Sequence, residues 1–170
     1  MKKLLLLLAA IGMIFTACQG GLDNEENGEM PTAQKKTIFY TSSDGNIVTP
    51  CRDYVFGARI VSNTYENGKG VIVFDAPVTS IGDYAFYYCT SLTSVTIPDS
   101  VTSIGNEAFG VCISLTSVYC KPTTPPAGGS DMFNNNAKGR KIYVPRNSVD
   151  AYKAAEYWSD YASYIEGYDF

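Results

Sequence analysis

The sequence predicts an α+β repeat fold, a short solenoid, on the strength of three observations. Residues 78–95 (VTSIGDYAFYYCTSLTSV) return at 101–118 as VTSIGNEAFGVCISLTSV, with thirteen of eighteen positions identical. The copies begin 23 residues apart, and a period of about 20 to 29 residues indicates a leucine-rich solenoid. The first copy runs into Leu92, Val95 and Ile97, which follow the L-x-x-L-x-L pattern of such repeats. Stacked units of this kind present one long exposed face, which generally binds partners.

The first residues predict export. Lys2 and Lys3 precede an apolar run from Leu4 to Phe15, which is too short to span a bilayer but suits a secretory signal, so residues 1–17 are expected to be removed. Thr16, Ala17 and Cys18 then resemble the lipobox of bacterial lipoproteins, although Phe15 stands where that family usually has leucine. The resemblance implies that Cys18 is acylated and becomes the mature N-terminus. Ordinary signal cleavage is the alternative.

Residues 18–36 are predicted to form a lipidated, flexible, acidic tether. Between Gln19 and Met30 the chain has four acidic residues, three glycines and no basic residue, so it cannot bury enough apolar surface to fold. The spacing of its carboxylates is not that of an EF-hand calcium loop. The stretch resembles the acidic segment that follows the acylated cysteine in surface lipoproteins of some Gram-negative anaerobes.

Residues 37–77 are predicted to form an N-terminal β cap, because a terminal repeat would otherwise expose its apolar face and sheet edge. Turn residues predict two hairpins, one over 37–48 around Asp44-Gly45 and one with its turn at Tyr65–Gly70. Ile72 and Phe74 are expected to continue the strand register of the repeats.

Residues 78–147 are predicted to be the repeats. In each, the L-x-x-L-x-L segment forms a short strand that Pro98 ends in the first copy. Before it, Ile81, Ala85, Phe86 and Cys89 have the spacing of one buried face of a short helical turn, and Gly82 permits a tight start to that turn.

The combination SIGxxAFxxCxSLTSVxIP resembles the BspA-like leucine-rich repeat of bacterial surface proteins, over residues 78–121 most strongly. A degenerate third unit follows at 122–147, since Phe86 precedes Pro98 by twelve residues and Phe133 precedes Pro145 by the same number. Its first part, KPTTPPAGGSDMF, predicts an irregular loop in place of the usual short strand.

Residues 148–170 are predicted to form a C-terminal helical cap. Ser148 is expected to cap a helix running to about Tyr157, with Val149, Tyr152 and Ala155 on one side. Trp158 would then cover the last repeat.

The composition excludes several functions. The chain has no histidine, which removes the commonest general base and zinc ligand. Without Lys2 and Lys3, eleven basic residues face seventeen acidic ones, a balance that disfavours nucleic acid and anionic lipid. With no paired acid site or phosphate loop readable, neither an enzyme nor a cofactor or metal site is predicted. The protein is expected to contact the membrane only through its lipid anchor.

The cysteines have a structural interpretation. Cys89 and Cys112 occupy the same repeat position, and Cys120 takes the inward place of Ile97, so all three are expected to behave as small buried hydrophobes. A Cys89–Cys112 disulfide is possible but strained, because stacked repeats keep their Cβ vectors parallel. Cys51 is not assigned.

The candidate ligand-binding residues lie on the exposed sheet. An outward column is predicted at Val73, Thr96, Tyr119 and Tyr143, and a flanking column at Val71, Ser94, Ser117 and Lys141. Tyrosines suit recognition, but stacked aromatic side chains also stabilise a sheet by themselves, so both interpretations stay open. Two further sets carry similar alternatives, the basic residues Lys138, Arg140, Lys141 and Arg146 and the tyrosines Tyr84, Tyr87 and Tyr88.

The resemblance to BspA-like proteins implies a non-catalytic adhesion or protein-binding module at the cell surface, anchored as an outer-membrane lipoprotein. The implied partner is a host extracellular or cell-surface protein. The alternative is a carbohydrate-binding surface lipoprotein, in which the outward tyrosines would stack on a glycan.

Overall fold

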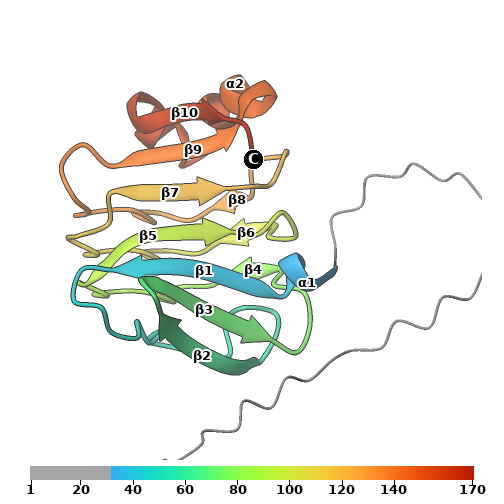
Figure 1. Ribbon diagram of the computed structural model, residues 1–170. Coiled ribbons are helices and arrows are strands. Elements are labelled where there is room, and N and C mark those ends of the chain that lie inside the picture. The colour runs from blue at the N-terminus through green and yellow to red at the C-terminus, as the bar shows by residue number, and fades with distance from the viewer. Residues whose placement is uncertain (1–31) are drawn as a thin grey trace, which may run out of the picture.

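The computed structural model describes residues 32–170, whose regular elements are mostly strands, with few and short helices (Figure 1). The strands form one seven-stranded and one three-stranded sheet. In spatial order, the larger sheet consists of β10 (Ile165–Tyr168), β9 (Lys141–Pro145), β7 (Ser117–Cys120), β5 (Leu92–Ile97), β1 (Thr37–Ser42), β3 (Lys69–Phe74) and β2 (Ile60–Glu66). The smaller sheet consists of β4 (Ser80–Ile81), β6 (Ser103–Ile104) and β8 (Ala127–Gly128). Among residues 32–170, no helix has the length and apolar character needed to cross a membrane.

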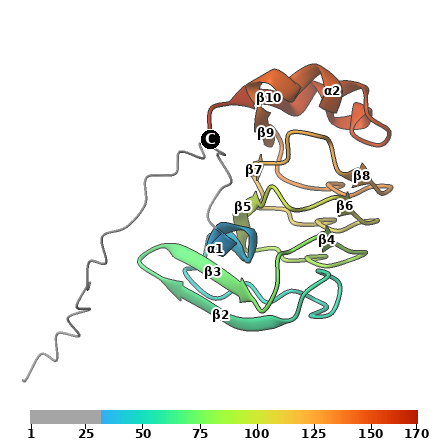
Figure 2. The same cartoon turned by 90° about the vertical axis from the view of Figure 1, so that its right-hand side faces the viewer.

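Each repeat contributes one strand to each sheet. In the larger sheet β5, β7 and β9 are parallel, with Val95 opposite Val118 and Val118 opposite Ile142. In the smaller sheet β4, β6 and β8 are parallel, so successive repeats stack (Figure 2). The expectation of an irregular loop in the third repeat is wrong, because Ala127 and Gly128 keep the two-residue strand and pair with Ser103 and Ile104.

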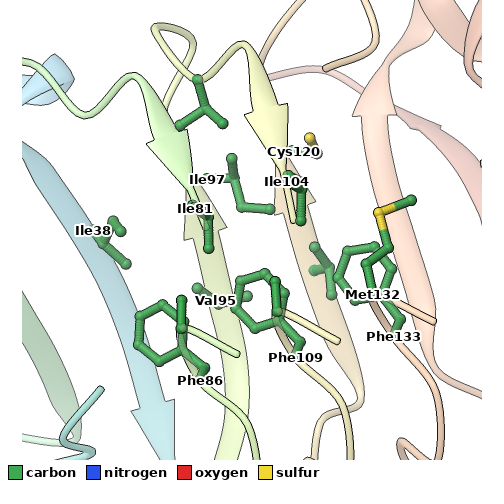
Figure 3. Close-up of a cluster of buried hydrophobic side chains, with 14 of the residues drawn as sticks. Ile38, Ile81, Phe86, Val95, Ile97, Ile104, Phe109, Cys120, Met132 and Phe133 are labelled. Carbon is green, nitrogen blue, oxygen red and sulfur yellow. The ribbon is translucent and has the colours of Figure 1, made fainter. Parts of the chain in front are cut away.

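The core lies between the two sheets. The strands point Ile81, Ile104, Val95 and Ile97 into it, and matching side chains from successive repeats lie side by side in rows (Figure 3). Phe86, Phe109 and Phe133 are each 0% exposed and stack in one column, with centroid distances of 5.2 and 5.4 Å. This column fills the space between the turns and the larger sheet.

The turn that leads from β4 to β5 is not helical, contrary to the expected helical turn over Ile81–Cys89. Tyr84 and Tyr88 have positive φ angles of 59° and 60°, which a right-handed helix excludes. Backbone NH groups therefore alternate in direction: that of Ala85 donates to Gly82 O within the turn, whereas those of Tyr84 and Phe86 donate to Asn106 O and Ala108 O of the next repeat. The turns are thus hydrogen-bonded to one another along the stack.

The N-terminal part departs from the expected pair of hairpins. Residues 67 and 68 do form a hairpin turn between β2 and β3, with positive φ at Asn67 and Gly68. However, β1 has no hairpin partner within 37–48; it lies between β5 and β3 and is antiparallel to both. As a result β3 does not continue the register of the repeats next to β5, because β1 takes that place. A four-residue helix, α1 (Thr32–Lys35), precedes β1.

The C-terminal part is less helical than expected. The 3-10 helix η1 (Arg146–Ser148) leads into α2 (Val149–Ala154), and η2 (Ser159–Tyr164) follows. Ser148 does not cap α2 with its side chain, since its hydroxyl donates to Thr123 O at 2.7 Å. Trp158 is fully buried, lies 5.9 Å from the Phe133 ring and donates to Pro126 O. Beyond η2 the chain forms β10, which pairs in parallel with β9 and was not expected.

Candidate recognition surface on the seven-stranded sheet

One row of side chains crosses the outward face of the larger sheet. The pairing register places Thr96 opposite Tyr119 and Tyr119 opposite Tyr143. On either side the row continues to Phe39 of β1 and Glu166 of β10. Val73, expected in this row, lies opposite Thr37 instead, because β1 separates β3 from the repeats.

The centre of the row is an aromatic cluster. Tyr119 and Tyr143 stack with their ring centroids 4.9 Å apart. Tyr168 of β10 contacts both rings at 5.5 Å, and Phe170 lies 5.0 Å from Tyr168. The C-terminal end of the chain turns back from β10 toward β7 and β9 in Figure 1. Tyr119 and Tyr143 are therefore half-buried, whereas Tyr168 and Phe170 are 42% and 48% exposed.

Tyr168 and Phe170 were missed from the sequence. The pattern Tyr168-Asp169-Phe170 alternates aromatic and polar residues, which is a weak signal of extended chain. The prediction of a C-terminal helical cap gave this signal no weight. The outward side chains of β10 and of the residues after it complete a surface that the repeats alone only begin.

Beside the aromatic cluster lies a shallow depression of about 360 Å³. Its lining consists of Phe39, Lys69, Thr96, Tyr119, Lys121, Tyr168, Asp169 and Phe170. Two ammonium groups flank it: Lys69 Nζ lies 4.1 Å from the Phe39 ring centroid and Lys121 Nζ lies 6.0 Å from that of Phe170. Aromatic rings beside cations give this depression the means to bind a ligand that combines apolar and anionic groups.

The side chains of the flanking polar row are engaged in hydrogen bonds and an ion pair within the chain. Ser94 lies opposite Ser117, and Ser117 lies opposite Lys141. The hydroxyl of Ser94 is 2.6 Å from that of Thr41. Lys141 forms an ion pair with Glu166, and the hydrogen bond to that carboxylate raises the pKa of Lys141. The charge of Lys141 is therefore already paired within the chain, and a ligand would have to compete with Glu166 for it.

The four basic residues between 138 and 146 do not form one patch. Lys138 is exposed, but the Arg140 side chain is buried. Its guanidinium lies over Tyr161 and Tyr164 and donates to Phe133 O, and burial lowers its pKa. Arg146 forms an ion pair with Asp169 at 2.7 Å. The basic cluster is thus divided among different environments, and two of its charges are paired.

A second aromatic group follows the turns of the first repeat. Tyr84 and Tyr88 are 37% and 66% exposed, and Tyr87 lies beside both. Arg52 lies 5.7 Å from the Tyr84 ring centroid. None of these three tyrosines lines the depression.

The remaining predicted residues are the cysteines. Cys112 and Cys120 are fully buried, and burial raises the pKa of each thiol to about 12. Cys89 is half-buried and Cys51 is exposed. Within residues 32–170 no group of three or more histidine, cysteine or carboxylate side chains has a metal-binding arrangement. Cys18 lies outside the described residues.

Comparison with known proteins gives one family. The model of the BspA type leucine-rich repeat region, with six copies, matches residues 59–157, which is more than half of the chain. None of the curated proteins matches it.

Proposed function

Because the chain belongs to the BspA type of leucine-rich repeat proteins, we propose that it is a non-catalytic adhesion module that binds host extracellular or cell-surface proteins. Leucine-rich repeats generally mediate protein–protein interactions, and their regular exposed sheet provides the contact surface. Function rests here on the site as well as on the family, since one fold carries many functions.

The observation that carries the proposal is the aromatic depression on the outward face. Tyr168 and Phe170 offer rigid rings to solvent, and next to aromatic rings of the depression lie Lys69, which is exposed, and Lys121, which is half-buried. Aromatic residues in such a setting are typical binding hot spots. Although the net charge of the chain is −4, the two lysines beside the aromatic rings favour a partner segment with acidic and apolar side chains at this place.

The remaining parts of the proposal concern how the recognition surface is held at the cell surface. We infer that residues 78–147 act as a short solenoid, that the β1–β3 strands and the C-terminal elements close its two ends, and that Cys18 anchors it to the outer membrane. The predicted tether of residues 18–36 would then be shorter, because Thr32–Lys35 form α1 and the carbonyls of Lys35 and Lys36 accept hydrogen bonds from Val78 and Phe74. Such an arrangement would hold the larger sheet away from the membrane, where a protein partner can reach it.

A binding panel tests the function. The chain with Cys18→Ser is immobilised and exposed to host matrix and cell-surface proteins, beside a Tyr119→Ala/Tyr168→Ala variant. Saturable binding to a protein that the variant loses supports the proposal. The matched control is Tyr54→Ala, which removes a 75% exposed tyrosine outside the depression and should bind normally. Binding that survives the double substitution would contradict the assigned surface.

Carbohydrate binding is the second candidate, because exposed rings such as those of Tyr168 and Phe170 also stack on sugar faces. A glycan array run with the same three proteins distinguishes the two. Glycan signals that vanish in the Tyr119→Ala/Tyr168→Ala variant, with no protein bound, would favour this alternative.

A further inference from the structure

Three thiols meet where residues 47–59 cross the turn of the first repeat. The segment containing Cys51 lies against the turn that ends at Cys89, and the contacts are reciprocal. Cys51 Sγ donates to Tyr87 O at 2.8 Å, and Cys89 Sγ lies 3.6 Å from Thr49 O. The backbone NH of Cys51 donates to Ala85 O at 2.8 Å. Cys51 and Cys89 are therefore adjacent, although 38 residues separate them in the chain.

Cys112 also lies near Cys89, but its position is fixed. The turns that carry Cys89 and Cys112 are joined by hydrogen bonds from Phe86 N to Ala108 O and from Tyr88 N to Gly110 O. Cys112 is 0% exposed, and its thiol donates to Phe86 O at 3.0 Å. A disulfide between these two stacked turns would therefore be strained, because closing it would shift hydrogen-bonded backbone.

Cys51 has the freedom that Cys112 lacks. It belongs to a stretch without regular secondary structure and is exposed to solvent. To reach disulfide geometry its thiol has to leave Tyr87 O, while the backbone of the stacked turn of Cys89 can stay in place.

We propose that Cys51 and Cys89 are a disulfide-forming pair whose oxidation ties the segment 47–59 to the first repeat. The oxidant is a disulfide compound of low molecular weight or the disulfide of an oxidoreductase. Cys112 and Cys120 stay reduced. This inference is independent of the proposed binding function.

The reaction balances as two thiol–disulfide exchanges. The exposed Cys51 thiolate attacks one sulfur of the oxidant, forms a mixed disulfide and releases one thiol. Cys89 then loses its proton to solvent and attacks Cys51 Sγ, and the second thiol leaves. The protein loses two protons and two electrons, which reduce one disulfide to two thiols. Burial and the neighbouring Cys112 and Cys51 thiols raise the pKa of Cys89, so the second exchange is the slower one and becomes faster as the pH rises.

Oxidation with glutathione disulfide tests the pair. The full chain with Cys18→Ser is incubated with an excess of glutathione disulfide, unreacted thiols are alkylated after denaturation, and the peptides are identified by mass spectrometry. The expected result is one cross-linked species joining the peptides of Cys51 and Cys89, with Cys112 and Cys120 alkylated. Closing a loop of this length should raise the melting temperature by about 5 °C or more.

The variants separate this pair from the others. Cys112→Ala should keep the Cys51–Cys89 cross-link, whereas Cys51→Ser should lose both the cross-link and the rise in melting temperature. Since Cys51 is exposed, its substitution should leave the reduced protein folded, which circular dichroism checks. A cross-link between Cys89 and Cys112, a stable mixed disulfide of Cys51 with glutathione, or two unmodified thiols at equilibrium would each overturn the proposal.

Discussion

The ring of Phe109 lies almost parallel to that of Phe86, with an interplanar angle of 4° and centroids 5.2 Å apart. Phe133 stacks on the other side of Phe109 at 5.4 Å. Equivalent residues of three repeats thus share one column, and the middle ring contacts a ring on each side. Residues at the same position of successive repeats therefore pack directly against each other in the core.

Replacement of Phe109 by alanine should therefore be costly. Removing a fully buried ring from the middle of the column leaves a cavity that both neighbours border, and we expect the free energy of unfolding to fall by about 3 to 5 kcal/mol. Urea denaturation followed by circular dichroism measures it. Ile113→Ala, at a position that is 58% exposed, serves as control and should change the stability by less than about 0.5 kcal/mol. Equal midpoints for the two variants would contradict the packing.

Gly105 should not tolerate a side chain, because the turn of the preceding repeat approaches it closely. A Cβ atom there would overlap the backbone nitrogen of Asp83 and lie 2.7 Å from Gly82 C. We expect Gly105→Ala to cost about 3 kcal/mol, as in overpacked cores. Gly45→Ala is the control: it has a positive φ but nothing within 4 Å of its Cβ, so only backbone strain of about 1 kcal/mol remains. Similar losses for both would show that close approach is unimportant.

The ion pair between Arg146 and Asp169 should hold the C-terminal aromatic residues in place in a pH-dependent way. Hydrogen bonds from Arg146 lower the pKa of Asp169 below its ordinary value of 3.8. A lowered pKa means that the pair contributes fully above pH 3.8 and is lost as the pH falls through the folded-state value. A near-ultraviolet circular dichroism titration from pH 6 to about 2 should show a step that Asp169→Asn lacks. Asp150→Asn, exposed on α2, should keep it.

The anchor gives a prediction at Cys18. If Cys18 is acylated, more than one acyl chain gives stable membrane attachment, and Cys18→Ala should move the protein from the membrane fraction to the soluble fraction. Mass spectrometry of the native protein identifies the modified residue. An unmodified soluble product that begins at another residue would exclude the anchor.

The stacking of the repeats was predictable because the sequence contains two nearly identical copies of the repeat, at 78–95 and 101–118. The period placed Thr96, Tyr119 and Tyr143 side by side, and the structure has this register. The conformation of the turns was not predictable in the same way. Ile81, Ala85 and Phe86 have a helical spacing of buried residues, yet the positive φ angles at Tyr84 and Tyr88 come from hydrogen bonds to the next repeat, which no local pattern reveals.

The ends of the stack were harder to predict for a related reason. Thr37–Ser42 pairs with strands far along the chain, and nothing local favours that insertion over a hairpin around Asp44-Gly45. At the other end, Ile165–Tyr168 belongs to no repeat but pairs with β9. The candidate surface needs residues from both ends, Phe39 and Tyr168, so the sequence predicted its centre and not its borders.

The last prediction concerns that centre. Tyr119→Ala combined with Tyr143→Ala removes the stacked pair on which Tyr168 rests. We expect the affinity for the partner found in the binding panel to fall by about 2 kcal/mol or more, roughly 30-fold. Since both side chains point away from the core, the melting temperature should fall only by what the three ring contacts among Tyr119, Tyr143 and Tyr168 contribute.

Titration calorimetry of the double variant, beside Tyr54→Ala as the exposed control, separates binding from folding. A folded double variant with unchanged affinity would move the recognition site elsewhere, and the group formed by Tyr84, Tyr87 and Tyr88 would be tested next, because two of its three rings are exposed. A weaker affinity in both variants would instead indicate a diffuse contact over several faces, which the focused depression beside Tyr119 and Tyr168 does not predict.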